Sequence, residues 1–231
     1  MSRRERLIKL ASAAAFLAVV GVAVLIVLSS GGSGGDAGNI QGASEVRRLL
    51  SGIPQKGMVL GKQAAKANLL EFGDLQCPVC KAFSEEVLPP IIENRVRNGE
   101  ATLDFRNFTI IGPQSTPAGA AALAAGEQGR GWSFVELFYR NQGAEDSGYV
   151  TDEFLTAVAR AAGVRDIARW NRERRGQRLV SRVEATTAEA ESLGFSGTPS
   201  FAIEGPHANG AEAIGGAPSG STLESAISEA G

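Results

Sequence analysis

The chain has 231 residues, of which 43% are hydrophobic and 21% are charged, an ordinary composition for a globular protein. Its formal net charge of −2 argues against nucleic acid as the main partner. Only two cysteines are present, so a small scaffold held together by several disulfides is excluded.

The first residues of the chain carry the pattern of a membrane anchor. Residues 1–9 form a basic tail with a single acid, and residues 10–28 hold no charged side chain. As a helix, this apolar run would span roughly 28 Å, close to the thickness of the hydrocarbon core of a bilayer. Because a basic flank favours the cytoplasmic side, we expect a cytoplasmic N-terminus and a single-pass anchor in the cell membrane. Everything after the anchor is then expected to be extracytoplasmic.

A cleaved signal peptide is the alternative to an anchor. The run is followed by the small residues Ser29-Ser30-Gly31-Gly32, which suit cleavage. The apolar region of a signal peptide, however, usually has only about 7–15 residues. Residues 29–43 are rich in glycine and serine and predict a flexible linker. The folded domain is therefore expected to comprise residues 44–231.

The folded domain opens with a short helix and two strands. Residues 46–53 carry apolar side chains at helical spacing, and residues 58–61 and 68–72 predict strands. A helical stripe follows the cysteine pair and reaches about Asn98, and residues 102–108 predict the next strand. A strand, a helix and a second strand in this order require a right-handed crossover, which pairs the two strands in parallel.

A long helical segment separates these strands from the end of the chain. Residues from about 113 to 194 predict helices, among them an alanine-rich helix and one rich in aromatic residues. Strand character returns at residues 199–203 and near 213–214, and a helix is predicted over 221–230. The economical fold class is therefore α/β, with a helical insertion at about 113–194.

The two cysteines lie three residues apart, as Cys77-Pro78-Val79-Cys80, where the strand 68–72 gives way to a helix. Pro78 suits the first turn of a helix, where a missing N–H has no cost. Cys77 is then at the helix N-terminus, where free backbone N–H groups and the helix dipole favour a thiolate. Cys80, one turn further, is shielded and can resolve a mixed disulfide. The motif predicts dithiol–disulfide exchange.

Three other interpretations of the cysteine pair are open. Half of a zinc site needs two further ligands, and His207 is the single histidine of the chain. A purely structural disulfide would close so short a loop that it would restrain little chain entropy. Haem attachment requires histidine at the position of Lys81. We therefore expect neither a metal nor a cofactor.

The second signal is Gly197-Thr198-Pro199, immediately before the apolar strand at 200–203. Proline at the opening of a central strand is unusual. A cis peptide bond would explain it, although only about one X–Pro bond in twenty is cis. Alone, the segment fits an ordinary strand start. Its position about 120 residues after the cysteine pair favours a functional interpretation.

The active-site segment resembles that of a known family. Residues Leu70 to Cys80, with Gly52-Ile53-Pro54-Gln55, the Gly197-Thr198-Pro199 turn and the helical segment between strands, are similar to DsbA-like thiol–disulfide oxidoreductases. The resemblance is greatest to the BdbD-like, membrane-anchored branch of Gram-positive bacteria, and it covers about residues 45–231. It implies a thioredoxin-like fold with the helical insertion and a redox-active disulfide between Cys77 and Cys80.

The same resemblance implies roles for three further residues. Pro199 is expected to follow a cis peptide bond, and Thr198 to offer backbone hydrogen bonds to an extended substrate. Glu71, six residues before Cys77, is matched to a buried acid near the active site. The alternative for Glu71 is a solvated strand residue, but glutamate is seldom buried without a function.

The expected function is disulfide exchange with the thiols of exported proteins, as a disulfide-donating oxidase. A membrane redox partner, by family resemblance a quinone-linked protein, would reoxidise the enzyme. Val79 stands where oxidising members of the family often carry histidine, so a reductase or isomerase on the same fold is the first alternative. A non-catalytic binding module tethered to the membrane is the second.

Two other features are interpreted as surface. His207 lies in the turn-rich loop 205–210 and is expected to be a plain surface histidine. An arginine-rich run predicts a solvated helix face, with a docking face for an acidic partner or anionic lipid headgroups as the alternative. The arginines of this run are Arg169, Arg172, Arg174, Arg175, Arg178 and Arg182.

Overall fold

The computed structural model describes residues 39–231. The predicted basic tail, the predicted anchor at residues 10–28 and the first part of the predicted linker lie outside the described residues. Within 39–231, no helix combines the length and the apolar character needed to cross a membrane.

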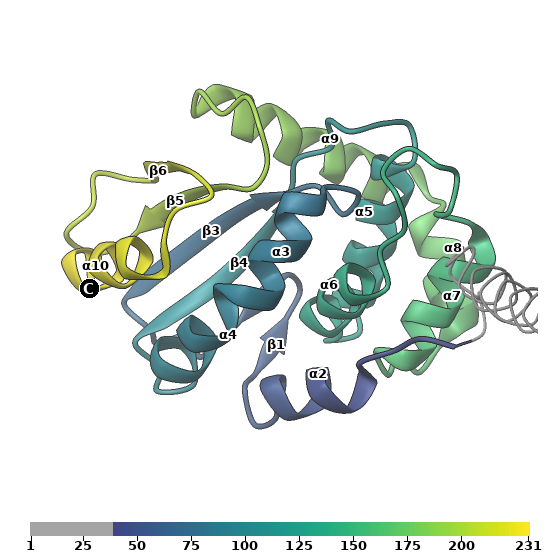
Figure 1. Ribbon diagram of the computed structural model, residues 1–231, viewed down its shortest axis with the longest axis horizontal. Helices are drawn as coiled ribbons and strands as arrows, with labels where there is room; N and C mark the ends of the chain where they lie inside the picture. The colour runs from purple at the N-terminus through teal and green to yellow at the C-terminus, as the bar shows by residue number, and fades with distance from the viewer. Residues whose placement is uncertain (1–38) are drawn as a thin grey trace, which may run out of the picture. The chain divides into compact units, whose positions relative to one another are not determined.

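A six-stranded sheet forms the centre of the domain (Figure 1). Its strands are β1 Gln55–Lys56, β2 Val59–Leu60, β3 Ala67–Gly73, β4 Ala101–Asn107, β5 Ser200–Glu204 and β6 Glu212–Gly216. They lie side by side in the order β1-β2-β4-β3-β5-β6. The pairing of β3 with β4 is parallel, which confirms the predicted crossover, and the other neighbouring strands are antiparallel.

The crossover between β3 and β4 is helical, as predicted, but it is made of three segments. They are α3 Pro78–Glu86, α4 Leu88–Ile91 and a π-helical turn, η1 Ile92–Val96. The break comes at Pro89 and Pro90, because neither residue has a backbone N–H to continue the ladder of hydrogen bonds from α3. Before the sheet, the predicted first helix is present as α2 Ala43–Leu50.

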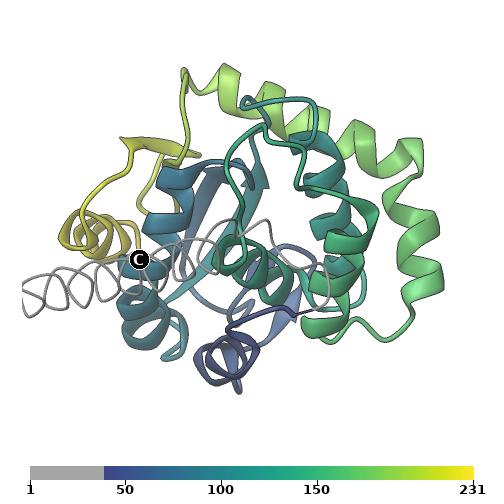
Figure 2. The same cartoon turned by 45° about the vertical axis from the view of Figure 1, so that its right-hand side comes forward.

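Five helices lie between β4 and β5 and form the helical insertion. They are α5 Ser115–Gly126, α6 Gly131–Arg140, α7 Asp152–Ala161, α8 Ile167–Arg174 and α9 Gln177–Ser192. In both views they lie beside the sheet (Figures 1 and 2). Nearly every residue of α5 is buried, because its alanine and glycine residues let the neighbouring helices approach closely.

The two faces of the sheet are covered by different helices. On one face, Leu70 and Phe72 of β3 pack with Ala190 of α9, and the Phe72 ring lies 5.3 Å from that of Phe195. The other face is covered by α3, α6 and the C-terminal helix α10 Gly220–Ala230. Successive side chains of a strand point to opposite faces, so Glu71 emerges on the face covered by α3 and α6. The fold therefore places this carboxyl behind the helix that carries the cysteines.

Candidate active site

Cys77 is the N-cap residue of α3, where β3 gives way to the helix. Pro78 occupies the first helical turn, as the motif predicts. The backbone N–H of Cys80 donates to the Cys77 sulfur over 3.4 Å, in the way that an oxygen-bearing cap residue accepts from the first turn. The side chain of Cys77 is only 4% exposed. Helix geometry thus holds this sulfur against backbone donors.

The surroundings of Cys77 favour its thiolate. Its pKa falls from an ordinary 9.0 to about 6, first because of a hydrogen bond with the Cys80 side chain. Partial burial opposes this shift, while hydrogen bonds with the Thr198 side chain and with the backbone of Cys80 and Val79 add to it. A large fraction of Cys77 is then ionised at neutral pH, as nucleophilic attack on a disulfide requires.

Cys80 has the opposite character. Its side chain has no exposed surface and lies one turn inside α3. Burial is the main reason that the pKa of Cys80 is raised well above 9.0, and the nearby Cys77 and Glu71 add to the effect. Both cysteines are free thiols in this structure. The two sulfurs therefore differ in accessibility and in acidity, although only two residues separate them.

Thr198 and Pro199 lie directly against the cysteine pair. The Cys77 thiol donates to the carbonyl oxygen of Thr198 over 3.4 Å, across 121 residues of sequence. The peptide bond between Thr198 and Pro199 is cis, which confirms the expectation from the sequence. The antiparallel pairing of β5 with β3 sets this contact, because Ser200 at the start of β5 pairs with Phe72 near the end of β3.

Glu71 is completely buried, so the solvated alternative is wrong. In the sheet it pairs with Phe105 of β4 on one side and Phe201 of β5 on the other. Neither carboxyl oxygen has a hydrogen-bond partner among the described residues. Burial is the first cause that raises the pKa of Glu71 from 4.5 to about 8, and repulsion by Glu136 is the second. Glu71 is therefore largely protonated at neutral pH. When it loses its proton, its negative charge raises the pKa of Cys80.

Two buried polar residues hold the loop that connects β3 to the cysteines. One oxygen of Asp74 accepts from the backbone N–H groups of Ile110 and Ile111 at 2.8 and 3.0 Å. Its other oxygen accepts from the N–H of Gln76 at 2.9 Å. The Gln76 side chain in turn donates to Ser115 of α5 over 3.0 Å. Sequence reasoning assigned no role to Asp74 or Gln76, although two polar residues beside a reactive motif were a usable signal.

The helical insertion also reaches the loop through Gln142, which follows α6. Its amide donates to the carbonyl oxygens of Leu75 at 2.7 Å and Cys77 at 3.1 Å. The hydroxyl of Tyr139 donates to the carbonyl of Asp74 over 3.3 Å. No local pattern marks Gln142 as part of the site, because its partners lie more than sixty residues away. The insertion therefore positions the cysteines as well as covering the core.

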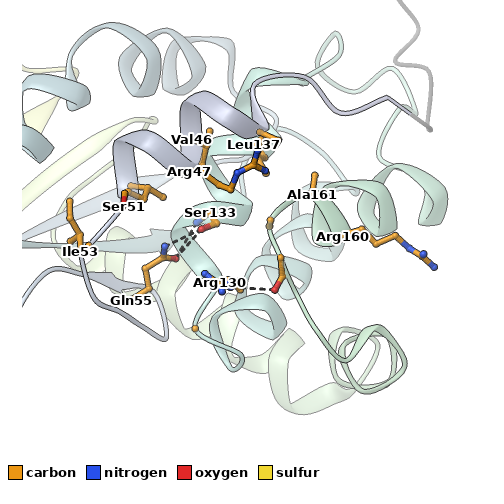
Figure 3. Close-up of a pocket in the computed structure, with 16 residues that line it drawn as sticks. Val46, Arg47, Ser51, Ile53, Gln55, Arg130, Ser133, Leu137, Arg160 and Ala161 are labelled. Carbon is orange, nitrogen blue, oxygen red and sulfur yellow. Dashed lines mark hydrogen bonds between the residues drawn. The ribbon is translucent and has the colours of Figure 1, made fainter.

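A cavity of the described residues lies away from the cysteines. It has a volume of about 430 Å³ and is lined by α2, α6 and α7 (Figure 3). Gln55 and Ser133 are hydrogen-bonded at its wall, and the Arg130 side chain donates to the carbonyl of Gly163 over 3.3 Å. None of the site residues predicted from the sequence lines this cavity.

Two predictions concerned the surface: that of an exposed His207 is confirmed, and that of a solvated arginine-rich run is partly wrong. His207 is exposed, as expected. The arginine-rich run is exposed for the most part, but Arg174 is only 6% exposed, so the solvated interpretation is wrong for that residue. Its guanidinium donates to Asp152 over 2.6 Å and lies 4.8 Å from the centre of the Trp170 ring. Arg178 pairs with Glu127, the C-cap residue of α5, so part of the run stabilises the helical insertion.

Comparison with known proteins agrees with this geometry. A thioredoxin family model matches residues 54–217. The probable disulfide bond formation protein D of Bacillus cereus is 29% identical over 153 residues, 65% of this chain and 71% of the relative. Disulfide bond formation protein D of Bacillus subtilis is 33% identical over 119 residues, 48% of this chain and 52% of the relative. The crystal structure of oxidised BdbD from Bacillus subtilis matches 76% of this chain and 96% of its own, with a TM-score of 0.66 and 21% identity. The chain therefore belongs to the thioredoxin family, as a DsbA-like member related to the disulfide bond formation proteins.

Proposed function

We propose that this thiol–disulfide oxidoreductase donates a disulfide between Cys77 and Cys80 to the thiols of exported proteins. The observation that carries the proposal is the difference between two neighbouring sulfurs. The pKa of Cys77 lies at about 6, while burial raises that of Cys80. Exchange needs one sulfur that attacks or leaves readily and a second that is protected until a mixed disulfide has formed. The names of the related disulfide bond formation proteins support the donating direction.

The reaction proceeds by two displacements at sulfur. A client thiolate attacks the Cys77 sulfur of the disulfide, the bond to Cys80 breaks, and Cys80 leaves as a thiolate that takes up a proton. A second client thiolate then attacks the client sulfur of the mixed disulfide, and Cys77 leaves as a thiolate. The client loses two electrons and gains a disulfide, and the enzyme holds the two electrons as a dithiol. A membrane redox partner would take them up and restore the disulfide.

The low pKa of Cys77 favours the oxidising direction. Only the reduced enzyme contains this thiolate, so its stabilisation makes the enzyme more ready to accept electrons. One pKa unit corresponds to about 1.4 kcal/mol, or about 30 mV for a two-electron couple. Val79, at the position of histidine in many oxidising members, adds no donor or charge. A moderate oxidant is therefore expected.

Apolar surface beside Cys77 suits an unfolded client. Val79 is 53% exposed and Ile110 is 43% exposed, and they are the large hydrophobic residues exposed in the described part of the chain. Ile110 is tied to the active-site loop through Asp74. A cavity of about 370 Å³, lined by residues 194–200 and 215–217, adjoins Thr198. An extended client segment could bond to the Thr198 backbone and place its own thiol at Cys77.

Turnover and trapping test the proposal. The oxidised enzyme, mixed with a peptide that holds two thiols, should produce the peptide disulfide and a reduced enzyme. Cys80→Ala should accumulate mixed disulfides, because no second sulfur resolves them, and Cys77→Ala should form none. Non-reducing electrophoresis and mass spectrometry measure both products. Mixed disulfides in the Cys77→Ala protein would show that the roles are reversed.

The same assay separates the alternatives. Rapid reduction of insulin, with slow oxidation of the dithiol peptide, would favour a reductase or isomerase. Client binding without any thiol exchange would favour a non-catalytic module.

The location of the domain is proposed from the apolar run at residues 10–28 and its basic flank. A reporter that is active only after export, fused after Gly231, should be active. Protease added to spheroplasts should digest the domain, while a tag on the N-terminus stays protected. An active reporter that requires the cytoplasm would contradict this topology.

A further inference from the structure

A second buried acid lies behind the cysteine-bearing helix. Glu136 is carried by α6, which packs against α3, and its side chain has no exposed surface. The helical insertion therefore contributes a carboxyl to the same side of the sheet as Glu71. Nothing in the CxxC motif, in the Thr198-Pro199 turn or in the proposed exchange accounts for an acid at this position.

Hydrogen bonds connect Glu136 to the active-site helix. Ser84 donates its hydroxyl proton to one oxygen of Glu136 over 3.1 Å. Ser84 is four residues after Cys80, so both side chains lie on the same face of α3. The second oxygen of Glu136 and both oxygens of Glu71 are buried without hydrogen-bond partners among the described residues. Three carboxyl oxygens without partners behind one catalytic helix are rare in a folded core and indicate a function.

The electrostatics connect the two acids to each other and to Cys80. Repulsion by Glu136 is one cause of the raised pKa of Glu71, and the charge of Glu71 raises the pKa of Cys80. Burial raises the pKa of Glu136 to about 7; Ser84 and Arg140 oppose the shift and Glu85 adds to it. Two carboxyls with raised pKa values that influence each other titrate as a pair near neutral pH.

The other elements packed against α6 do not add a charge to this pair. Helix α5 carries no titratable side chain. The charged residues of α2, α7 and β1 are exposed to solvent. Tyr139 of α6 is buried, and the surrounding acids raise its pKa after burial itself, so it is neutral. The charged neighbours of Glu136 are therefore Glu71, Glu85 and Arg140.

We propose that Glu136 acts through Glu71 as the second member of a two-carboxyl proton reservoir for Cys80. The inference rests on the proposed exchange reaction and extends it to the helical insertion. When Cys80 leaves as a thiolate, the reservoir gives it a proton and becomes singly negative. When Cys80 attacks a mixed disulfide, its proton returns to the reservoir and the electron pair of the thiolate forms the new S–S bond. Glu136 shares the negative charge that Glu71 would otherwise hold alone among phenylalanine side chains.

A chromogenic aromatic disulfide, dithiobis(nitrobenzoate), separates the two sulfurs kinetically. The reduced protein should release one coloured thiol when Cys77 attacks the reagent. A second coloured thiol should follow when Cys80 attacks the Cys77 adduct. Stopped-flow absorbance records both phases over a range of pH. The first phase reports the ionisation of Cys77, and the second reports the transfer of the Cys80 proton to the reservoir.

The wild-type second phase should rise with pH in two ionisations, near 7 and 8. Glu136→Gln should leave a single ionisation, with a midpoint below 8 because the like charge has been removed. Ser84→Ala should move the lower ionisation to higher pH, because its hydrogen bond lowers the pKa of Glu136. Glu86→Gln, the same change on an exposed position of α3, is the matched control and should keep both ionisations.

A second phase whose pH profile is the same in the wild type, Glu136→Gln and Ser84→Ala would overturn the inference. If Glu136→Gln does not fold, Ser84→Ala alone decides, since it preserves the carboxyl and removes only its donor. A wild-type protein that releases no coloured thiol in the first phase would instead contradict the proposed exchange function. The two failures are therefore distinguishable in one measurement.

Discussion

Cys77 and Cys80 differ because the first caps the N-terminus of α3 and the second lies one turn inside the helix. At the N-cap, the sulfur of Cys77 accepts a hydrogen bond from the backbone N–H of Cys80. Such donors are available because the N–H groups in the first turn of a helix have no partner within the helix. One turn later such donors are engaged in the helix, and Cys80 is surrounded by the core. The same helix start thus stabilises a thiolate on the first sulfur and a thiol on the second.

Alkylation should reproduce this difference. In the folded, reduced protein, iodoacetamide should modify Cys77 with a midpoint near pH 6, and Cys80 should react only after unfolding. Mass spectrometry of digested protein measures each site separately. The denatured protein is the control, in which both cysteines should titrate near the ordinary 9.0. Val79→His should lower the midpoint of Cys77 further, and equal modification of both cysteines at pH 7 would refute the assignment.

The site residues that could be predicted from the sequence belong to short motifs of neighbouring residues. The cysteine pair and Thr198-Pro199 are visible as short motifs, and the structure brings them together. Gln142 and Glu136 were not foreseen, because their polar character acquires meaning only through partners far away in the sequence. A helical pattern shows which positions are polar, but it does not show which element they face.

At the scale of elements, the loop from Gly73 to Cys77 is held from two directions. Asp74 connects the loop by hydrogen bonds to the segment that follows β4, and Gln142 connects it by hydrogen bonds to the helical insertion. Gly73 has no side chain, and a Cβ there would lie 2.8 Å from the Phe105 ring and 3.0 Å from the Tyr139 hydroxyl oxygen. The close approach of the loop to α6 therefore depends on glycine at this position.

Asp74→Ala should release this loop. Three backbone N–H groups would lose their acceptor, and each buried unsatisfied donor costs about 1–3 kcal/mol. The free energy of unfolding, measured with urea, should fall by at least about 2 kcal/mol. Asp74→Asn is the conservative control, since it keeps one oxygen and should cost less. Equal stability of Asp74→Ala and the wild type would show that the loop is not fastened through this carboxylate.

The elements that could be predicted have strong periodicity or clear boundaries. The apolar run of β3, the parallel β4 and the amphipathic α2 were all foreseen. The strand β1 was not foreseen, because two residues are too few to show an alternation of apolar and polar side chains. The break between α3 and α4 was missed, since the apolar spacing continues through Pro89 and Pro90. The burial of Arg174 depends on Asp152 and Trp170, which only tertiary packing supplies.

For the whole molecule, Glu71 and Glu136 make stability depend on pH. Their pKa values in the folded protein, about 8 and about 7, exceed the ordinary 4.5. As the pH rises above 4.5, the unfolded chain loses these protons before the folded protein does. Deprotonation therefore favours unfolding, and the free energy of unfolding falls between about pH 4.5 and 8. The reduced Cys77, with its lowered pKa, works in the opposite direction from pH 6 to 9.

Glu71→Gln should remove much of this decline. The comparison is best made in a Cys77→Ala/Cys80→Ala background, which eliminates the opposing thiolate. Between pH 5 and 8, the background protein should lose stability on the order of 3 kcal/mol more than the Glu71→Gln protein does. Urea unfolding followed by circular dichroism measures both. A decline of the same size in the two proteins would mean that Glu71 does not titrate in this window.

The contact between Cys77 and Thr198 also bears on the time before the chain is complete. While the chain is being synthesised, Cys77 emerges 121 residues ahead of the residue that its sulfur contacts. Helix α3, with nine residues, is too short to be stable before it is packed. The hydrogen bonds that lower the pKa of Cys77 come from Cys80 and Val79 at the start of this helix and from Thr198, so we expect the thiol of the nascent chain to have a pKa closer to the ordinary 9.0. We therefore expect Cys77 to reach its full reactivity only after the segment that carries Thr198 has folded against it, so that an incomplete chain reacts little with the cysteines of its neighbours.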